Sequence, residues 1–165
     1  MSGVTVNVVL QDIKKLETEA VIVVFFEDVR PLKGLAGELD WLLCGSLSSL
    51  ILSKKLRGSL GDVALLTSQG KLPTQKIFMV GLGPRAGFSA SVLRSTARTA
   101  VTSALGAGAT KMAVEYFRPS DASHDGSVSA LCEGFSEGAG GRAVDVTLLA
   151  PDAAAYEKIA PLVNR

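Results

Sequence analysis

The sequence is poor in the residues that most often bind metal ions or carry acid/base catalysis. It has a single histidine, His124, so neither a histidine-rich metal site nor a relay of two histidines can be built from this chain. Two cysteines and one histidine also fall short of the four ligands of a structural zinc site. We therefore expect no metal site and no bound cofactor.

Positive and negative charges are nearly balanced in the sequence. Seventeen Lys and Arg residues stand against sixteen Asp and Glu residues, which gives a net charge of +1. Such a small net charge provides no bulk attraction to nucleic acid or to an anionic membrane. Any charged partner would have to be met by a local patch of side chains.

Long hydrophobic runs are absent as well. The longest, residues 20–26, is far shorter than the roughly 20 residues of a membrane-spanning helix. The first residues, MSGVTVNVVLQDIKK, lack the basic start and the cleavage site of a secretory signal. We therefore expect no membrane span and a cytoplasmic location. In that compartment Cys44 and Cys132 are expected to be buried thiols on apolar helix faces rather than a disulfide.

What the sequence does contain is the composition of one globular domain over residues 1–165. Hydrophobic residues make up 47% of the chain and charged residues 20%. A domain of this size buries roughly 70% of the surface of its unfolded chain, so a core forms without disulfides or metals.

Apolar runs of strand length alternate with amphipathic segments along the chain. Strands are predicted at residues 4–10, 20–26, 62–67, 76–80, 111–117 and 144–150. Helices are predicted at residues 35–43 with a break at 45–46 and a continuation to 51, at 89–105, at 128–135 and at 153–163. Strands interleaved with helices predict an α/β fold, a three-layer α/β/α sandwich with a mixed central sheet.

The connections between these elements are predicted as follows. The strands at 62–67 and 76–80 are close enough in sequence to form a hairpin. Residues 118–126 form a polar loop, and the glycine-rich residues 134–141 form a flexible connection.

The stretch GLGPRAGFS, residues 81–89, is the most suggestive of a binding site, because it follows a predicted buried strand and opens a predicted helix. Glycines allow close backbone approach, and free N–H groups at a helix start attract an anion such as phosphate. Gly81, Gly83, Arg85 and Gly87 are therefore candidate ligand-binding residues. The spacing is one residue off the dinucleotide fingerprint, so a structural turn that needs small residues is the alternative.

Other charged groups have structural explanations. His124 lies among polar turn residues and is predicted to be an exposed loop histidine. Arg94 and Arg98, one helical turn apart, could contact phosphate, as could the basic residues at 54–57. A solvated face is the commoner explanation for such groups.

Positions scattered along the chain form a recurring pattern. Gly34 begins a leucine-rich helix, which is followed by basic residues at 54–57, a Gly-x-x-Gly turn at 58–61 and a strand that ends in Gly-Leu-Gly at 81–83. The later segments LRSTARTAVTSAL, SALCEGFSEGA and VDVTLLAPD continue the pattern. In these features the sequence resembles the N-terminal domain of the leucyl aminopeptidase, or cytosol aminopeptidase, family over nearly its whole length.

The resemblance implies a domain separate from the peptidase chemistry. In that family the two-metal site belongs to a C-terminal domain with motifs like Gly-Lys-Gly-x-x-x-Asp-x-Gly-Gly and Asn-Thr-Asp-Ala-Glu-Gly-Arg, and neither motif occurs in this sequence. Because the N-terminal domain flanks a hexameric core in the family, self-association or docking on a protein partner is expected.

Two further segments, QDIKKLETEAVIV and KIFMVGLGP, are similar to the opening and a later strand of macro domains. This similarity implies a macro-domain-like fold, with Asp12 at the position whose carboxylate reads an adenine amino group. Gly34 and Gly37 are what remains of the first glycine-rich phosphate loop. Residues 23–26 and 119–126 lack most of the polar and glycine residues with which macro domains hold the distal ribose and the second phosphate.

These observations lead to two expected functions. The first is a non-catalytic macro-like domain that occurs without the catalytic domain and acts as a binding or assembly module. The alternative is a receptor for a nucleotide or an ADP-ribose-like molecule. Its candidate ligand-binding residues are Asp12, Gly34, Gly37, Gly81, Gly83, Arg85 and Gly87. Nucleic-acid binding, which occurs in some aminopeptidases of this family, is disfavoured by the net charge of +1.

Overall fold

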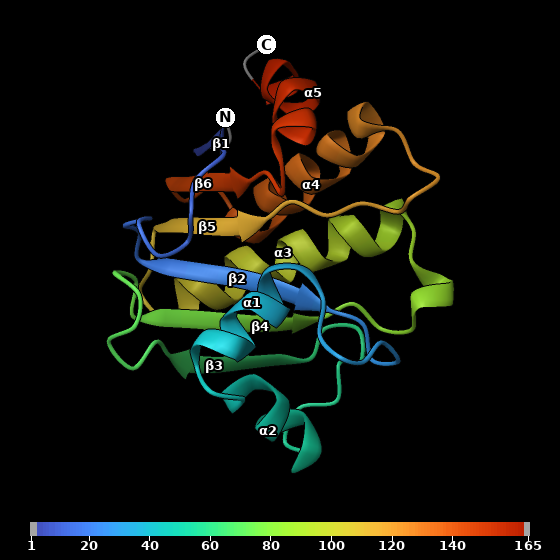
Figure 1. Cartoon of the computed structure of the whole chain (residues 1–165). Coiled ribbons are helices and arrows are strands. Elements are labelled where there is room, and N and C mark those ends of the chain that lie inside the picture. Colours follow the sequence, from blue (N-terminus) through green and yellow to red (C-terminus); the bar gives the residue numbers. More distant parts are fainter. Residues whose placement is uncertain (1–2, 164–165) are drawn as a thin grey trace.

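A mixed sheet of six strands forms the middle layer of the molecule (Figure 1). The computed structural model describes residues 3–163. The strand order in the sheet is β1-β6-β5-β2-β4-β3. Five strands run parallel to one another: β1 (Val4–Val9), β2 (Ala20–Phe25), β4 (Lys76–Gly81), β5 (Lys111–Glu115) and β6 (Val144–Leu149). The remaining strand, β3 (Val63–Thr67), pairs antiparallel with β4, which confirms the predicted hairpin.

Helices cover both faces of this sheet (Figure 1). One face carries α1 (Gly34–Leu42) and α2 (Ser46–Leu52), and the other carries α3 (Ala90–Gly106), α4 (His124–Ala139) and α5 (Ala153–Val163). A short 3-10 helix, η1 (Arg85–Gly87), precedes α3. The predicted three-layer α/β/α sandwich with a mixed sheet is therefore confirmed.

The central strand β2 shows why the chain folds into three layers. All six of its residues are buried. Val21, Val23 and Phe25 pack into the core under α1 and α2, whereas the alternate residues of the strand pack into the core under α3, α4 and α5. Since side chains alternate across a strand, a run that is apolar at every position needs helices on both sides.

Helix α3 matches its predicted pattern. The stripe of small and branched apolar residues from Leu93 to Leu105 is buried, and the side chain of Ser89 accepts a hydrogen bond from the backbone N–H of Val92 at 3.4 Å. A serine in this position caps the free N–H groups at a helix start.

Helix α4 is longer than predicted, because the glycine-rich residues belong to it. The sequence predicts a helix over 128–135 and a flexible connection over 134–141, but α4 runs through this region and ends at Gly140 in the left-handed conformation. Gly134 and Gly138 face α3, where a Cβ on Gly134 would lie 2.2 Å from the carbonyl oxygen of Arg94. These glycines allow two helices to touch backbone to backbone, and the prediction of flexibility was wrong.

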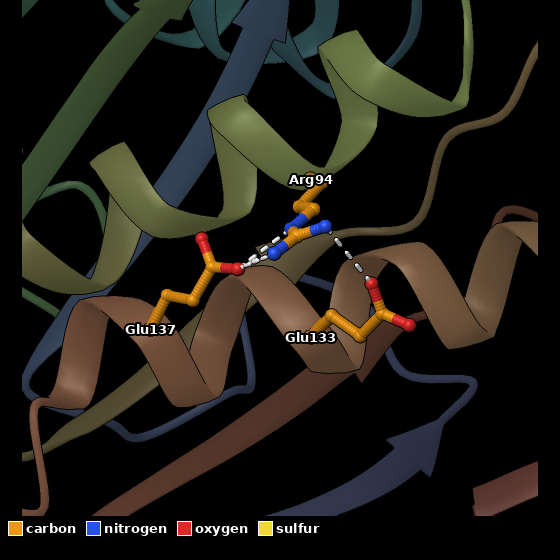
Figure 2. Close-up of polar contacts among 3 residues, drawn as sticks. All are labelled: Arg94, Glu133 and Glu137. Atoms are coloured by element: carbon orange, nitrogen blue, oxygen red, sulfur yellow. Dashed lines mark hydrogen bonds and ion pairs between the residues drawn. The ribbon is translucent and has the colours of Figure 1, made fainter.

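Arg94 spans the same helix contact on its solvent side (Figure 2). Its Nε donates to Oε1 of Glu137 at 2.6 Å, and its Nη1 lies 3.5 Å from Oε2 of Glu133. These pairs raise the pKa of Arg94, chiefly through the hydrogen bond to Glu137. Arg94 is thus engaged in joining α3 to α4, in agreement with the solvated-face interpretation.

The prediction of two buried thiols fails for Cys44. This residue is exposed in the turn between α1 and α2, at φ 55°, and its Sγ lies 3.4 Å from Nζ of Lys71. The apolar pattern extends past the end of α1 at Leu42, where the chain turns and carries the cysteine off the helix face. Cys132 is half-buried against the core, and this burial raises the pKa of its thiol.

No single helix within residues 3–163 is long and apolar enough to cross a membrane, and only the sharply bent pair α1 and α2, taken together, passes on length and composition.

The contact between α3 and α4 predicts the effect of adding one methyl group. Gly134→Ala would force the two helix backbones apart, since its Cβ would also lie 2.6 Å from the Cβ of Ala97. We expect the free energy of unfolding, measured by urea denaturation, to fall by about 2 to 3 kcal/mol. Gly106→Ala is the matched control, because a Cβ there meets nothing within 4 Å and should leave stability equal or slightly higher. Equal stability of the two variants would contradict the close helix contact.

Candidate functional site

A cavity of about 730 Å³ opens at the edge of the sheet where the parallel strands end. Its walls come from segments that follow β2, β4, β5 and β6 and from the first turns of α5. Because parallel strands finish at the same edge, segments far apart in the sequence meet there, and in open α/β sheets this is the usual place for a ligand. The volume lies within the roughly 300–1,000 Å³ of small-molecule sites.

Three phenylalanines form a continuous aromatic wall of this cavity. Phe26 and Phe88 meet edge to face with ring centroids 5.1 Å apart, and Phe88 stacks on Phe117 at 6.0 Å. They come from three different segments, after β2, before α3 and after β5. The wall offers a surface for an apolar or planar group of a ligand.

Tyr116 and His124 form a hydrogen-bonded pair in the cavity wall. The hydroxyl of Tyr116 lies 2.8 Å from Nδ1 of His124, and the rings stack. Burial raises the pKa of Tyr116 to about 12, while burial first, and then Arg118 and Lys158, lower the pKa of His124. At neutral pH the tyrosine therefore keeps its proton and the imidazole is uncharged, so the two groups share one neutral hydrogen bond.

This pair corrects the prediction of an exposed loop histidine. His124 is the first residue of α4 and is half-buried, because the helix begins four residues earlier than the pattern indicates. The side chain of Ser123 makes this early start possible, since its oxygen accepts a hydrogen bond from the N–H of Gly126 at 3.0 Å.

The carboxylate of Glu115 lies at the end of β5, beside the start of α1. Its Oε2 accepts a hydrogen bond from the N–H of Leu35 at 2.9 Å, and its Oε1 accepts one from the N–H of Val24 at 3.3 Å. Burial raises its pKa to about 7, against the lowering effect of these two N–H groups, and Glu38 raises it further. Near neutral pH, Glu115 is therefore divided between its neutral and charged forms.

Basic side chains outnumber acidic ones around the cavity. Lys33, Arg85, Arg118 and Lys158 line it together with the acidic Glu115 and Asp152. Both ion pairs within the described part of the chain are made by Arg94, so these four cations have no salt-bridge partner there. Arg118 also donates from Nη1 to the carbonyl oxygen of Ala122 at 2.6 Å, which fixes the loop beneath it.

A second cavity of about 510 Å³ adjoins the first. Gly34, Glu115 and Pro151 line both. The charged residues that line the second cavity are all acidic: Asp12, Glu38 and Glu115. Within residues 3–163, however, no group of three or more His, Cys, Asp or Glu side chains is arranged to hold a metal ion.

Three of the seven predicted site residues line these cavities. Asp12 lines the second cavity, where its Oδ1 accepts a hydrogen bond from the N–H of Lys14 at 3.0 Å, Gly34 lines both, and Arg85 lines the first. The structure thus brings together the start of α1 and parts of the two loops that the sequence singles out. Their role in ligand binding stays a prediction.

The other four residues, Gly37, Gly81, Gly83 and Gly87, line neither cavity. Packing accounts for two of these glycines, since a Cβ on Gly37 would lie 2.4 Å from the carbonyl oxygen of Leu32, and a Cβ on Gly81 would lie 2.4 Å from that of Ser59. Gly83 has φ +78°, which favours glycine. These contacts support the structural-turn interpretation of residues 81–87.

The sequence also carried a signal for Glu115 that residue-by-residue reasoning missed. This residue is the acid near the end of the strand predicted at residues 111–117, and the ends of parallel strands often lie at ligand sites in α/β folds. The aromatic wall gave no comparable signal, because the meeting of its three rings depends on which strands are neighbours. The position of His124 was missed because α4 begins earlier than predicted.

The raised pKa of Glu115 predicts how stability varies with pH. Its folded-state value of about 7 lies above the unfolded-state value of 4.5, so its contribution to stability is complete below about pH 4.5 and is lost as the pH rises through 7. Glu115→Gln removes this titration. Between pH 5 and pH 8 the free energy of unfolding of the parent should fall by about 2 to 3 kcal/mol relative to the variant.

The measurement is a series of urea titrations across this pH range. Glu157→Gln is the matched control. It removes one carboxylate from an exposed position on α5, so its free energy of unfolding should vary with pH as that of the parent does. Parallel profiles for the parent and Glu115→Gln would contradict the assignment.

Comparisons with known proteins identify the family of the chain. The "Cytosol aminopeptidase family, N-terminal domain" model matches residues 22–139. A probable cytosol aminopeptidase of Geobacter sulfurreducens is 35% identical over 95 residues, which are 57% of this chain and 19% of that protein. One from a Cyanothece strain is 40% identical over 80 residues, 48% of this chain and 16% of that protein. The chain spans between 16% and 20% of the length of the curated relatives it matches.

Solved structures share the fold at low sequence identity. A tomato leucine aminopeptidase mutant aligns with TM-score 0.71 and 18% identity over 94% of this chain and 34% of that one. The Oceanobacillus iheyensis macrodomain with ADP aligns with TM-score 0.75 and 12% identity over 95% of this chain and 88% of that one. The Trypanosoma brucei macrodomain in complex with ADP-ribose aligns with TM-score 0.72 and 15% identity over 96% of this chain and 68% of that one. The chain therefore belongs to the cytosol aminopeptidase family, and it contains the N-terminal, macro-like domain of that family.

Proposed function

We propose that this domain is a non-catalytic binding module whose larger cavity holds a small organic anion with an apolar or planar part. The observation that carries the proposal is the composition of the cavity wall. Four basic side chains without salt-bridge partners among the described residues and three phenylalanine rings share one cavity of about 730 Å³. A site of this kind combines charge attraction with apolar contact.

Two further observations support a binding role without catalysis. The aminopeptidase metal motifs occur nowhere in this sequence, and its one histidine is hydrogen-bonded to Tyr116. Macrodomains of the same fold are described with ADP and with ADP-ribose, so nucleotides are natural probes for the cavity. At the start of α1, however, the N–H of Leu35 already bonds to Glu115, and a ligand anion is expected among the basic residues instead.

The test of this function is a panel of organic anions. We expect AMP, ADP, ADP-ribose or N-acetylphenylalanine to raise the melting temperature, since a ligand at 100 times its dissociation constant contributes about 2.7 kcal/mol. Arg85→Ala and Lys158→Ala should each weaken binding about tenfold in calorimetric titrations. Lys55→Ala, an exposed lysine outside both cavities, is the matched control. A melting temperature that no member of the panel changes would refute the proposal.

Self-association is a second candidate function, favoured by exposed apolar side chains on α1 and α2. Trp41 and Leu52 are both 82% exposed, and Leu65 on the edge strand β3 is 52% exposed. Trp41 and Leu52 lie on α1 and α2, which contact each other, and large exposed apolar side chains that gather in one place are typical of a protein contact. We propose a second copy of this domain as the partner.

This proposal predicts a change of molar mass in light scattering. The parent should form an oligomer, whereas the double variant with Trp41→Ser and Leu52→Ser should be a monomer with unchanged circular dichroism. Tyr156→Ser, which removes a large exposed side chain from α5, should keep the oligomer. A parent that is monomeric at every concentration would rule out self-association.

A further inference from the structure

His124 stands among positive charges in the wall of the larger cavity. Arg118 and Lys158 line this cavity with it, and after burial these two cations lower the pKa of its ring. His124 is also the first residue of α4, and the start of a helix carries a partial positive charge. The protein by itself therefore disfavours a proton on the imidazole, in the part of the site where a ligand anion is expected.

Tyr116 determines which nitrogen of this ring a ligand would use. Its hydroxyl lies 2.8 Å from Nδ1 of His124, and the two rings stack with centroids 5.8 Å apart. Because Nδ1 is engaged within the protein, a ligand that bonds to the ring must use Nε2. In the protonated imidazole both nitrogens carry a hydrogen, so Nδ1 donates to the tyrosine oxygen and Nε2 is a donor for an oxygen of the ligand.

An organic anion reverses the balance at His124. Beside Arg118 and Lys158, its negative charge offsets the two positive charges that oppose a proton on the ring. An opposite charge within roughly 4–6 Å favours the charged form of a titratable group. The bound anion and the proton therefore stabilise each other, and the protonated ring adds a fifth positive charge to the four basic residues of the cavity.

The other charged groups around the cavity act on the ring in both directions. Glu115 and Asp152 line the cavity and Asp125 follows the histidine in α4, and their negative charges favour the protonated ring. Lys33 and Arg85 line the cavity as well and oppose it. Glu115, with its pKa of about 7, also gains a proton as an anion approaches, so a test must observe the histidine separately.

We propose that His124 is a ligand-binding residue of the larger cavity, and that the domain takes up its organic anion together with a proton on this ring. The inference rests on the proposed function, because the anion in question is the one held by the basic residues of that cavity. It adds one hydrogen-bond donor, Nε2–H, and it makes the affinity for the anion higher at pH 5 than at pH 8.

The test uses the fact that the chain contains a single histidine, whose ring Cε1–H signal in NMR spectra reports its pKa directly. The probes are N-acetylphenylalanine and ADP-ribose, whose charges stay constant between pH 5 and pH 8. At saturation, at least one probe should raise the pKa of the histidine by about one, which corresponds to a tenfold change in affinity. In calorimetric titrations, the dissociation constant of that probe should fall at least fivefold from pH 8 to pH 5.

Three variants separate the contributions. His124→Asn should lose the part of the pH dependence that the ring carries, and any part that remains belongs to Glu115. Lys158→Gln removes one opposing cation and should raise the pKa of the histidine without any probe. Lys55→Ala, which lies outside both cavities, should match the parent in the NMR titration and in calorimetry.

The outcomes distinguish this inference from the proposed function. A probe that binds through Arg85 and Lys158 but leaves the pKa of the histidine unchanged would overturn the role of His124 and leave the organic-anion site intact. If neither probe binds at pH 5, the inference is wrong even where another anion of the panel binds. If no organic anion binds at all, both proposals fall.

Discussion

The carboxylate of Glu115 connects three segments at the carboxyl edge of the sheet. It belongs to β5, accepts a hydrogen bond from the N–H of Val24 in the neighbouring strand β2, and accepts another from the N–H of Leu35 in the first turn of α1. This arrangement needs a glycine before Leu35, because a Cβ on Gly34 would lie 2.6 Å from Oε2. The same contact joins the sheet to α1 and forms the wall that both cavities share.

Much of the fold could be predicted because local patterns and packing agree. The uniformly apolar β2, the apolar stripe of α3 and the hairpin of β3 and β4 all formed as expected. Helix α4 was misjudged because glycine favours loops by its intrinsic propensity, whereas Gly134 and Gly138 serve a contact with α3. Such a contact depends on a second helix, so a local reading of the sequence does not show it.

The candidate site was only partly predictable for the same reason. Gly34 and Arg85 lie in segments whose local patterns, a helix start and a glycine-rich turn, stand out in the sequence. Glu115 gains its surroundings from the strand order, in which β5 lies beside β2 although many residues separate them in the chain. His124 was misplaced because α4 begins four residues earlier than the pattern indicates. The exposed position of Cys44 was missed because apolar periodicity alone did not locate the end of α1.

The shared fold of this domain and the macrodomains does not determine what the cavity binds. A fold places the start of a helix at the carboxyl edge of the sheet, but the residues there decide which charge is attracted. In this chain a glutamate takes the Leu35 N–H, and three of the four basic residues of the larger cavity, Arg85, Arg118 and Lys158, stand on other segments. The Leu35 donor at the start of α1 is thus occupied by a carboxyl group of the protein itself. An anionic part of a ligand is therefore expected at Arg85, Arg118 and Lys158, and not at the start of α1.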